Sequence, residues 1–484
     1  MRVLDPWARN PACWEKISII ARVAQGSFRR RWICPRGARP RIAKRRLAHF
    51  WTKCIHLGQG GAPGCGVGLR RRPPRGGRHV MTVEDRLARW RRRYPRVADL
   101  APRARRRLPG FLHDFVVGGL GDDLALGGAR AALDAVEIVP RYGVGAEGLD
   151  TGATLFGERF AAPLAIAPIG GDGSIWPGAT RAFARAARAA RLPYMAGTLA
   201  SHPVEQVAGW LEQGRWFQLY TMPGDDHRVS LDLLARAAAA GVTAVAVTVD
   251  VPLPARRYRD MRNGLRMPMR PGPRHIAQAA SRPAWLAALA RHGVGQFANL
   301  APYADAPDRG SIGGFVAREG PGAGAGWPVL ARLRDAFPGA MLVKGLQHPA
   351  DAANAVALGY DGVIVSNHGG RQFDAAPAPI DVLPAIRDAV GPAPTLLLDG
   401  GILSGLDILR AQVCGADGVL AGRAFMLGLA ALGQDGPAHV AETLIDEYRI
   451  ALGQSGALTG AGARGMTHRH PGRWPALAFG EEAP

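Results

Sequence analysis

A histidine followed by two glycines and an arginine is the feature of this sequence best suited to chemistry. It lies in the stretch Ser366-Asn367-His368-Gly369-Gly370-Arg371-Gln372-Phe373-Asp374. Paired glycines let the backbone approach a ligand closely, and Arg371 can hold an anion near the imidazole. An imidazole beside a carboxylate-sized anion is suited to taking a proton from a small acid. For this motif alone, a turn histidine bonded only to backbone is the simpler interpretation. The surrounding elements decide between this structural histidine and a proton-accepting one.

The residues before the motif predict where the histidine lies. Gly362-Val363-Ile364-Val365 is a short apolar run rich in β-branched residues, which is typical of a buried parallel strand. A strand that ends in Ser-Asn-His and turns at once through Gly-Gly places its histidine on the rim of a sheet or barrel.

Strand and helix patterns alternate along most of the chain, which indicates a parallel sheet. The expected strands are Pro163–Pro168, Pro193–Gly197, Trp216–Tyr220, Ala244–Asp250, Met341–Lys344, Gly362–Ser366, Thr395–Asp399 and Gly418–Ala421. The expected helices are Ala179–Arg191, Val204–Gln213, Ser230–Ala240, Pro349–Leu358, Ile380–Val390 and Ser404–Cys414. Eight strands of this kind predict an α/β fold, a (β/α)8 barrel with a helical N-terminal lead-in.

Two further observations bear on this fold. An open Rossmann sheet is the alternative, but no Gly-x-Gly-x-x-Gly follows the first strand. The interval between the fourth and fifth strands is too long for one helix and a turn. Residues Arg262–Gly326 are rich in Gly, Pro, Ala and Arg, and we expect them to form a long loop over the barrel mouth.

Polar or ionisable side chains end most of the expected strands. They are Gln218, Tyr220, Thr248, Asp250, Lys344, His368, Asp399 and Arg423. A barrel carries its chemistry on the rim where strands end, and the loops after strands seven and eight are its usual phosphate site. Gly400-Gly401 and Gly422-Arg423 would offer backbone N–H groups and one guanidinium to such a phosphate. Any one rim residue could be an ordinary hydrogen-bonder, but the set together indicates an active site.

Positive charge is concentrated in the first eighty residues. They hold nineteen Lys or Arg against two acids, whereas the remaining 404 hold 42 basic and 37 acidic residues. Three interpretations compete: a basic arm for nucleic acid or an anionic membrane, an Arg-rich targeting segment, or translation that starts at Met81. We favour the third, because Thr82 and Asp85 form the capping signature of a helix. Residues 1–80 are thus expected to be a disordered or non-native extension, and 81–484 the functional unit.

The cysteines and the apolar runs set further limits. Four of the five cysteines lie in the first eighty residues without Cys-x-x-Cys spacing, so no zinc site and no other metal is expected. The body has Cys414 alone, which fits a reduced, cytoplasmic protein. No apolar run reaches the roughly 18 residues of a membrane span.

The rim residues, in this order, resemble the FMN-dependent α-hydroxy-acid oxidising family from about Leu108 onward. Ser366-Asn367-His368-Gly369-Gly370-Arg371-Gln372 is the most specific motif. Lys344-Gly345-Leu346-Gln347-His348-Pro349 and Ala167-Pro168-Ile169-Gly170 look most like the lactate 2-monooxygenase, or lactate oxidase, branch. The resemblance implies FMN as cofactor, a 2-hydroxy acid as substrate and a homotetramer or higher oligomer.

The resemblance also implies roles for single residues. His368 would be the base, oriented by Asp250, while the α-hydrogen passes to flavin N5 as hydride or after carbanion formation. Arg257 and Arg371 would clamp the substrate carboxylate beside Phe115, and Tyr220 would hydrogen-bond the substrate. The residues that would bind the cofactor are Pro168, Ile169, Gly170, Thr198, Gln218, Thr248, Lys344, Ser366, Asp399, Gly400, Gly401, Gly422 and Arg423.

Three departures from the family pattern bear on substrate and cofactor. Phe115 stands where a tyrosine hydroxyl usually contacts the substrate carboxylate, and Leu403 stands where an arginine usually follows Asp-Gly-Gly-Ile. Gly197 and Leu199 replace a more polar or aromatic pair. The missing hydrogen bond is worth roughly 1.5–3 kcal/mol. Weaker FMN binding and a more apolar pocket, for an acid larger than glycolate, are the expected consequences.

Three electron acceptors are compatible with these residues. The first is O₂, giving a 2-oxo acid and peroxide or a decarboxylating monooxygenation, and Gly170 would leave room for oxygen over N5. The others are a quinone or a cytochrome, as in a linked lactate dehydrogenase. A paralogue acting on a peptide-derived or carrier-bound substrate is the rival enzyme. A nucleic-acid or membrane-surface protein directed by the basic arm is the rival class, and we rank nucleic acid low.

Overall fold

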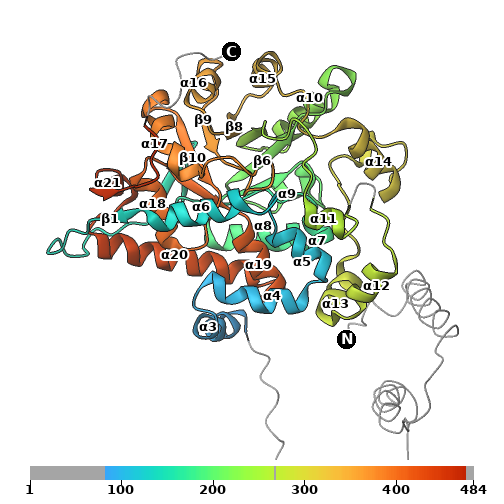
Figure 1. Cartoon of the computed structure of the whole chain (residues 1–484), viewed down its shortest axis with the longest axis horizontal. Coiled ribbons are helices and arrows are strands. Elements are labelled where there is room, and N and C mark those ends of the chain that lie inside the picture. The colour runs from blue at the N-terminus through green and yellow to red at the C-terminus, as the bar shows by residue number, and fades with distance from the viewer. Residues whose placement is uncertain (1–81, 266–268, 476–484) are drawn as a thin grey trace, which may run out of the picture. The chain divides into compact units, whose positions relative to one another are not determined.

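Eight parallel strands close into a barrel, as the alternating pattern predicts (Figure 1). The structure is a computed structural model that describes residues 82–265 and 269–475. The barrel strands are β4 (Leu164–Ile166), β5 (Tyr194–Gly197), β6 (Arg215–Tyr220), β7 (Ala244–Thr248), β8 (Ala340–Leu346), β9 (Gly362–Val365), β10 (Thr395–Asp399) and β11 (Gly418–Ala421). They pair in chain order, and β11 closes the barrel by pairing with β4.

Helices follow the strands and cover the barrel (Figure 1). They are α7 (Asp172–Ile175), α8 (Ala179–Ala190), α9 (Val204–Gly209), α10 (Gly224–Ala239), α15 (Trp327–Asp335), α16 (Pro349–Ala357), α17 (Pro379–Val390), α18 (Gly405–Val413) and α19 (Arg423–Leu432). Helix α18 shows how the sequence sets a boundary, because the Ser404 hydroxyl accepts a hydrogen bond from the Asp407 N–H and the Asp407 carboxylate accepts one from the Ser404 N–H.

Most elements before and after the barrel pack onto its helices, whereas β2 and β3 pack against the barrel strands. The leading ones are α3 (Val83–Arg93), η2 (Val97–Leu100), α4 (Ala101–Arg107), α5 (Gly110–Val117), α6 (Leu124–Ala135), β1 (Glu137–Ile138), β2 (Ala153–Leu155) and β3 (Glu158–Phe160). The trailing ones are α20 (Gly436–Ser455), α21 (Gly460–Arg464) and β12 (His468–Arg469), which pairs with β1. Thr82 and Asp85 form the expected capping box of α3. The predicted extension lies outside the described residues.

The interval after β7 contains more structure than the long loop that its composition predicts. It holds α11 (Tyr258–Arg262), α12 (Pro273–Ala280), α13 (Pro283–His292), η3 (Ala301–Tyr303) and α14 (Arg309–Glu319). Each longer helix has a local start signal. Pro273 and Pro283 occupy first-turn positions, and the Asp308 side chain accepts hydrogen bonds from the Gly310 and Ser311 N–H groups.

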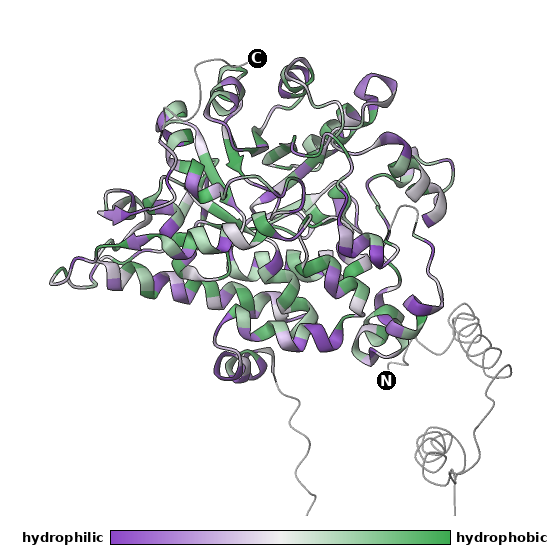
Figure 2. Cartoon of the chain, in the orientation of Figure 1, coloured by the Kyte–Doolittle hydropathy of each residue, from purple (hydrophilic) through white to green (hydrophobic). Residues whose placement is uncertain are grey.

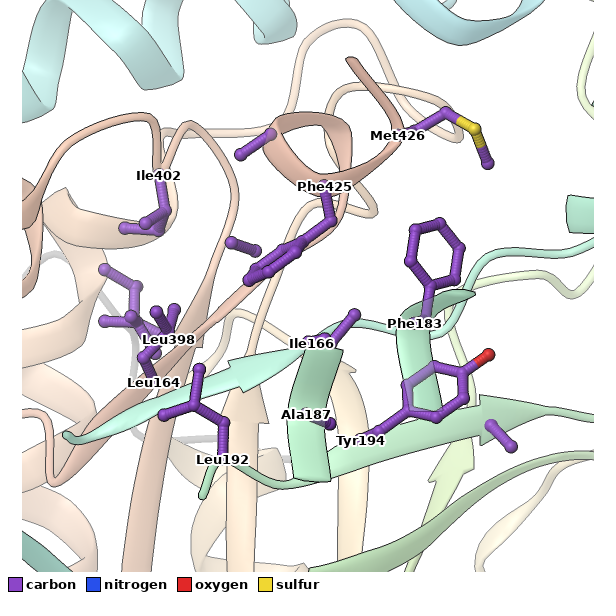
Figure 3. Close-up of a cluster of buried hydrophobic side chains, with 14 of the residues drawn as sticks. Leu164, Ile166, Phe183, Ala187, Leu192, Tyr194, Leu398, Ile402, Phe425 and Met426 are labelled. Carbon is purple, nitrogen blue, oxygen red and sulfur yellow. The ribbon is translucent and has the colours of Figure 1, made fainter. Parts of the chain in front are cut away.

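Apolar side chains fill the space between the strands and the helices. Figure 3 shows one such cluster, in which Ile166 of β4 and Tyr194 of β5 lie near Phe183 of α8 and Phe425 of α19. In Figure 2 the barrel strands are mostly green, whereas α3 on the outside is mostly purple. This core fixes the strand ends, and therefore the rim. None of the helices in 82–265 and 269–475 is long and apolar enough to cross a membrane.

Candidate active site

His368 and Asp250 form the centre of the site, as predicted. His368 follows β9 and Asp250 lies two residues beyond β7, and the Nδ1 and Oδ1 atoms are 2.9 Å apart. Burial raises the pKa of Asp250, but the His368 imidazole and the Lys344 ammonium together lower it further, so this pKa lies below its usual value. An ionised carboxylate only accepts hydrogen bonds, so Nδ1 carries the proton and the Nε2 lone pair is free to take one.

Tyr220 completes this centre from the end of β6. Its hydroxyl lies 3.3 Å from His368 Nε2, and the two rings are nearly parallel at 10°. Burial, followed by the charge of Asp250, raises the pKa of Tyr220 above its usual value, so the phenol stays a hydrogen-bond donor. A donor and an acceptor therefore face the same point, where a substrate hydroxyl could exchange hydrogen bonds with both.

Two backbone positions make the His368–Asp250 contact possible. His368 has a φ of +55°, which is uncommon for a residue with a side chain, and its N–H donates to Ser366 Oγ at 3.0 Å. Gly345 has a φ of +104°, and a Cβ there would lie 2.5 Å from Asp250 Cγ. Only glycine leaves the space that this carboxylate occupies.

Lys344, Ser366 and Asp399 form a connected polar group beside this centre. Lys344 Nζ donates to Ser366 Oγ at 2.9 Å and lies 2.9 Å from Asp399 Oδ2, and Ser366 Oγ donates to Asp399 Oδ1 at 2.9 Å. Burial lowers the pKa of Lys344, but Asp399 and Asp250 raise it further than burial lowers it. A charged ammonium is therefore kept on the rim, where it can stabilise negative charge on a bound ring.

The predicted cofactor residues on β5, β6 and β7 are also brought together. Gln218 Nε2 donates to Thr248 Oγ1 at 2.9 Å, and the Thr198 hydroxyl donates to the Gln218 backbone oxygen at 2.8 Å. Thr198 Oγ1 in turn accepts from the Tyr220 N–H at 2.9 Å. All three polar side chains are buried, so their positions are fixed by one another.

The segment after β4 borders the same region. A Cβ on Gly197 would lie 3.6 Å from Pro168 Cβ, and a Cβ on Gly422 would lie 4.0 Å from Ile169. A Cβ on Gly170 would meet only Leu199, at an ordinary 3.6 Å. No protein atom therefore forces glycine at position 170, which fits space kept for a bound group.

Arg257, Arg371 and Phe115, which are predicted to clamp the substrate carboxylate, lie together. The Arg371 Cζ lies 4.5 Å from the centre of the Phe115 ring, and the Arg257 Cζ lies 5.3 Å from it. Arg371 Nη1 donates to the Phe115 and Gly118 backbone oxygens at 2.7 and 3.0 Å. Burial, then the charges of Arg257 and Arg423, lowers the pKa of Arg371 well below its usual range. Two guanidiniums over one ring, with burial disfavouring the charge of Arg371, are suited to binding an anion.

Arg423 holds the other end of the site. It is the first residue of α19, and it donates to the Val116 and Gly118 backbone oxygens, both at 3.1 Å. Burial lowers the pKa of this guanidinium as well, against the weaker pull of Asp399 and Asp123. Gly400 and Gly401 have φ values of +110° and +87°, which only glycine adopts readily. A helix start, a glycine turn and a buried guanidinium make an anion site.

Leu403 contributes no charge to this end. The nearby Arg130 donates to the Gly401 backbone oxygen at 2.7 Å, but its guanidinium is paired with Asp407 and Asp134 at 2.7 Å each. Asp407 also accepts from the Leu403 and Ser404 N–H groups. Arg130 therefore supports the turn rather than offering a free charge to a ligand.

One charged residue of the site was not predicted from the sequence. Asp260 Oδ2 lies 3.2 Å from Arg257 Nε, and the Asp260 side chain is buried beside the clamp. The spacing of three residues from Arg257 on a short helix was the signal that could have identified it.

A family model described as FMN-dependent dehydrogenase matches residues 104–464. This chain belongs to that family. An L-lactate dehydrogenase of Caulobacter vibrioides is 39% identical over 75% of this chain and 93% of its own, and one of Pseudomonas aeruginosa is 38% identical over 74% and 94%. Among solved structures, mandelate oxidase with (S)-4-hydroxymandelic acid has a TM-score of 0.68 at 38% identity, covering 78% of this chain and 99% of that one.

Another solved relative is the monotopic membrane protein (S)-mandelate dehydrogenase, with a TM-score of 0.72 at 31% identity over 78% of this chain and 99% of that one. The family membership makes this chain an FMN-dependent α-hydroxy-acid oxidoreductase. These relatives are named for lactate and mandelate enzymes and do not single out the lactate 2-monooxygenase branch that the sequence favoured.

The residues present fit FMN. Arg423 has no carboxylate on its donor atoms among the described residues, and Gly400, Gly401 and Gly422 follow β10 and β11, which pair with each other. Lys344 supplies buried positive charge at the other end of the predicted cofactor residues, and Gln218 and Thr248 supply polar groups between them. A phosphate needs the first set and a polar ring edge needs the second.

Proposed function

We propose that this chain oxidises an L-2-hydroxy acid with a side chain larger than that of glycolate to the 2-oxo acid. The observation that carries the proposal is the alignment of the Tyr220 hydroxyl, His368 Nε2 and Asp250 beside two partly buried arginines, Arg257 and Arg371. FMN, when bound, supplies the two-electron acceptor. His368 takes the proton of the substrate hydroxyl at Nε2, and Asp250 stabilises the resulting imidazolium through Nδ1.

The arginines orient the acid so that this proton faces His368. The carboxylate of the substrate would lie between Arg371 and Arg257, whose planar forks suit both of its oxygens. Tyr220 would donate to the substrate oxygen, because its raised pKa keeps the phenol protonated. The positive charge of Lys344 would favour the reduced state of the bound ring.

The size of the substrate is proposed from Leu199, Gly197 and Phe115. Leu199 lies next to Gly170, and none of the three residues has a polar side-chain group that could bind a ligand. An apolar wall gains about 0.8 kcal/mol for each CH₂ group that it buries. Relatives named for lactate and mandelate support acids with a methyl or phenyl group.

We further propose O₂ as the acceptor that reoxidises the cofactor, giving peroxide or a decarboxylated product. The space at Gly170 supports this proposal. A quinone or cytochrome acceptor is the alternative, and the dehydrogenase names of several relatives favour it. A peptide-derived or carrier-bound substrate is the remaining alternative, and the two clamping arginines argue against it. The cytoplasmic location and the homotetramer stay predictions.

One set of assays tests these proposals together. The full chain is loaded with FMN and supplied with glycolate, L-lactate, L-2-hydroxyoctanoate or (S)-mandelate, under air and with a quinone under argon. We expect kcat/KM to be lowest for glycolate, and peroxide or CO₂ to appear under air. Glycolate as the best substrate would refute the proposed size preference, and turnover only with the quinone would refute O₂ as the acceptor.

A further inference from the structure

We propose that Phe115 and Asp260 are positioning residues that hold Arg257 and Arg371 ready for the substrate carboxylate, an inference that rests on the proposed function. Neither residue offers the hydroxyl that a tyrosine at position 115 would offer. Phe115 acts through the face of its ring, and Asp260 acts through the edge of the Arg257 guanidinium that carries Nε.

The guanidiniums of Arg257 and Arg371 repel one another. Both lie over the same Phe115 ring, at 4.5 and 5.3 Å from its centre, and Arg371 is partly buried. Like charges over one ring disfavour one another when no anion is bound, and the charge of Arg257 lowers the pKa of Arg371. The negative face of an aromatic ring attracts both cations, so the ring offsets part of this repulsion.

Asp260 sets the direction in which the Arg257 guanidinium points. Asp260 Oδ2 lies 3.2 Å from the Nε atom of Arg257, and the Asp260 side chain is only 10% exposed. Holding the guanidinium at Nε leaves its two terminal nitrogens for another carboxylate. The charge of Asp260 also balances one of the two arginines, so the clamp retains one positive charge for a monovalent acid.

Phe115 and Asp260 are held in position relative to each other. Phe115 belongs to α5 and Asp260 to α11, which lie side by side (Figure 1). Asn263, which ends α11, donates from Nδ2 to Asp114 Oδ2 at 2.8 Å, and its backbone oxygen lies 2.6 Å from His275 Nε2. The ring and the carboxylate therefore approach the arginines from two elements whose relative position is set by hydrogen bonds.

The ring is tested by Phe115→Leu, which keeps apolar volume and removes the π face. The probe is oxalate, a small dicarboxylate without a hydrogen to give up, and its binding to the FMN-loaded full chain is followed by the change in flavin absorbance. We expect Phe115→Leu to raise the dissociation constant of oxalate about tenfold. Phe115→Tyr retains the face and is expected to bind oxalate at least as tightly as the parent.

The carboxylate is tested by Asp260→Asn, which keeps the shape and removes the charge. The expected result is an increase in KM of about fivefold with kcat within about twofold, because the clamp and not the proton transfer is affected. Asp260→Glu restores the charge and should recover most of the affinity. A fall in kcat at unchanged KM would overturn the role assigned to Asp260.

Phe315→Leu is the matched control for the ring. Phe315 lies on α14 beneath Arg318, whose Cζ is 6.0 Å from the ring centre, so it loses a comparable cation–π contact away from the clamp. We expect it to leave oxalate binding unchanged. Equal oxalate affinity of Phe115→Leu and the parent would overturn the inference. A parent that binds oxalate but is reduced by no 2-hydroxy acid would instead refute the proposed function and leave the clamp standing.

Discussion

The two candidate anion sites on the barrel rim each lack a group that the family pattern provides, with different expected consequences. At the substrate end, Phe115 replaces a hydroxyl, but two arginines, a ring face and Asp260 remain in contact. At the phosphate end, Leu403 replaces an arginine, and Arg423 is left with a glycine turn and a helix start. The Gly118 backbone oxygen accepts from both Arg371 and Arg423, so one turn after α5 supports both ends.

The cations that could replace one another are therefore unevenly distributed between the two ends of the site. The substrate end retains two cations of its own, so a single missing hydrogen bond is tolerated there. The phosphate end depends on one guanidinium, because Arg130 is already paired with Asp407 and Asp134. Cofactor affinity should therefore be the more fragile property of this chain, and variants at the two ends should separate it from substrate affinity.

Among the variants that compare the two ends, the largest effect is expected between them, at Gly345. A Cβ in Gly345→Ala would displace the Asp250 carboxylate from His368, so we expect kcat to fall about 300-fold with FMN and oxalate binding little changed. Rapid-mixing measurement of flavin reduction checks this. Gly391→Ala is the control, because its φ is +72° and nothing lies within 4 Å of the added atom. A similar fall in both variants would show strain rather than displacement of Asp250.

At the substrate end, Arg371→Lys keeps the charge but loses the planar fork and its bonds to the Phe115 and Gly118 oxygens. We expect kcat/KM to fall about 100-fold, since hydrogen bonds to charged groups are worth about 1.5–3 kcal/mol each. FMN content after gel filtration should equal that of the parent. Loss of FMN together with activity would contradict the separation of the two ends.

At the phosphate end, Arg423→Lys should weaken FMN binding and leave substrate affinity unchanged. We expect the dissociation constant of FMN to rise about 30-fold, because the fork that reaches the Val116 and Gly118 oxygens and a phosphate cannot be replaced by an ammonium. At saturating FMN, KM for the acid should match that of the parent. Fluorescence titration of FMN measures the first quantity and steady-state kinetics the second.

The smallest expected effect is a gain in FMN affinity. Leu403→Arg should lower the dissociation constant of FMN about tenfold, the value of one partly exposed charged contact of about 1.4 kcal/mol. Leu403→Met is the control for a change of shape without charge. An unchanged FMN affinity in the arginine variant would mean that Arg423 and the glycine turn already suffice, and the contrast between the two ends would be lost.

The sequence predicted the barrel and most of the rim because both depend on local pattern. β10 and β11 match their predicted bounds, since apolar strand residues there are followed directly by Gly-rich turns. β8 runs two residues beyond its prediction, past the irregular pairing at Gly345. α10 spans Gly224–Ala239, but Asp225, Asp226 and His227 have positive φ, so its regular part begins after them, close to the predicted Ser230.

The contacts that could not be predicted are long-range ones. The Arg423 bonds to Val116 and Gly118 join residues more than 300 positions apart, and they depend on how α5 docks. The helices α12 to α14 were hidden by Gly and Pro composition, because capping at Asp308 and at the first-turn prolines outweighs intrinsic propensity. The start at Met81, and the role of residues 1–80, stay predictions.

The most direct test of the account is an anaerobic titration of the FMN-loaded full chain with L-lactate and (S)-mandelate, recorded as the visible spectrum, with His368→Gln as the matched variant. We predict that at least one acid bleaches the flavin absorbance of the parent, and that the variant, although it binds FMN and oxalate normally, bleaches about 10²–10⁴-fold more slowly. A parent that keeps its oxidised spectrum with both acids, or a variant that bleaches as fast as the parent, would contradict the assignment of His368 as the base of 2-hydroxy-acid oxidation.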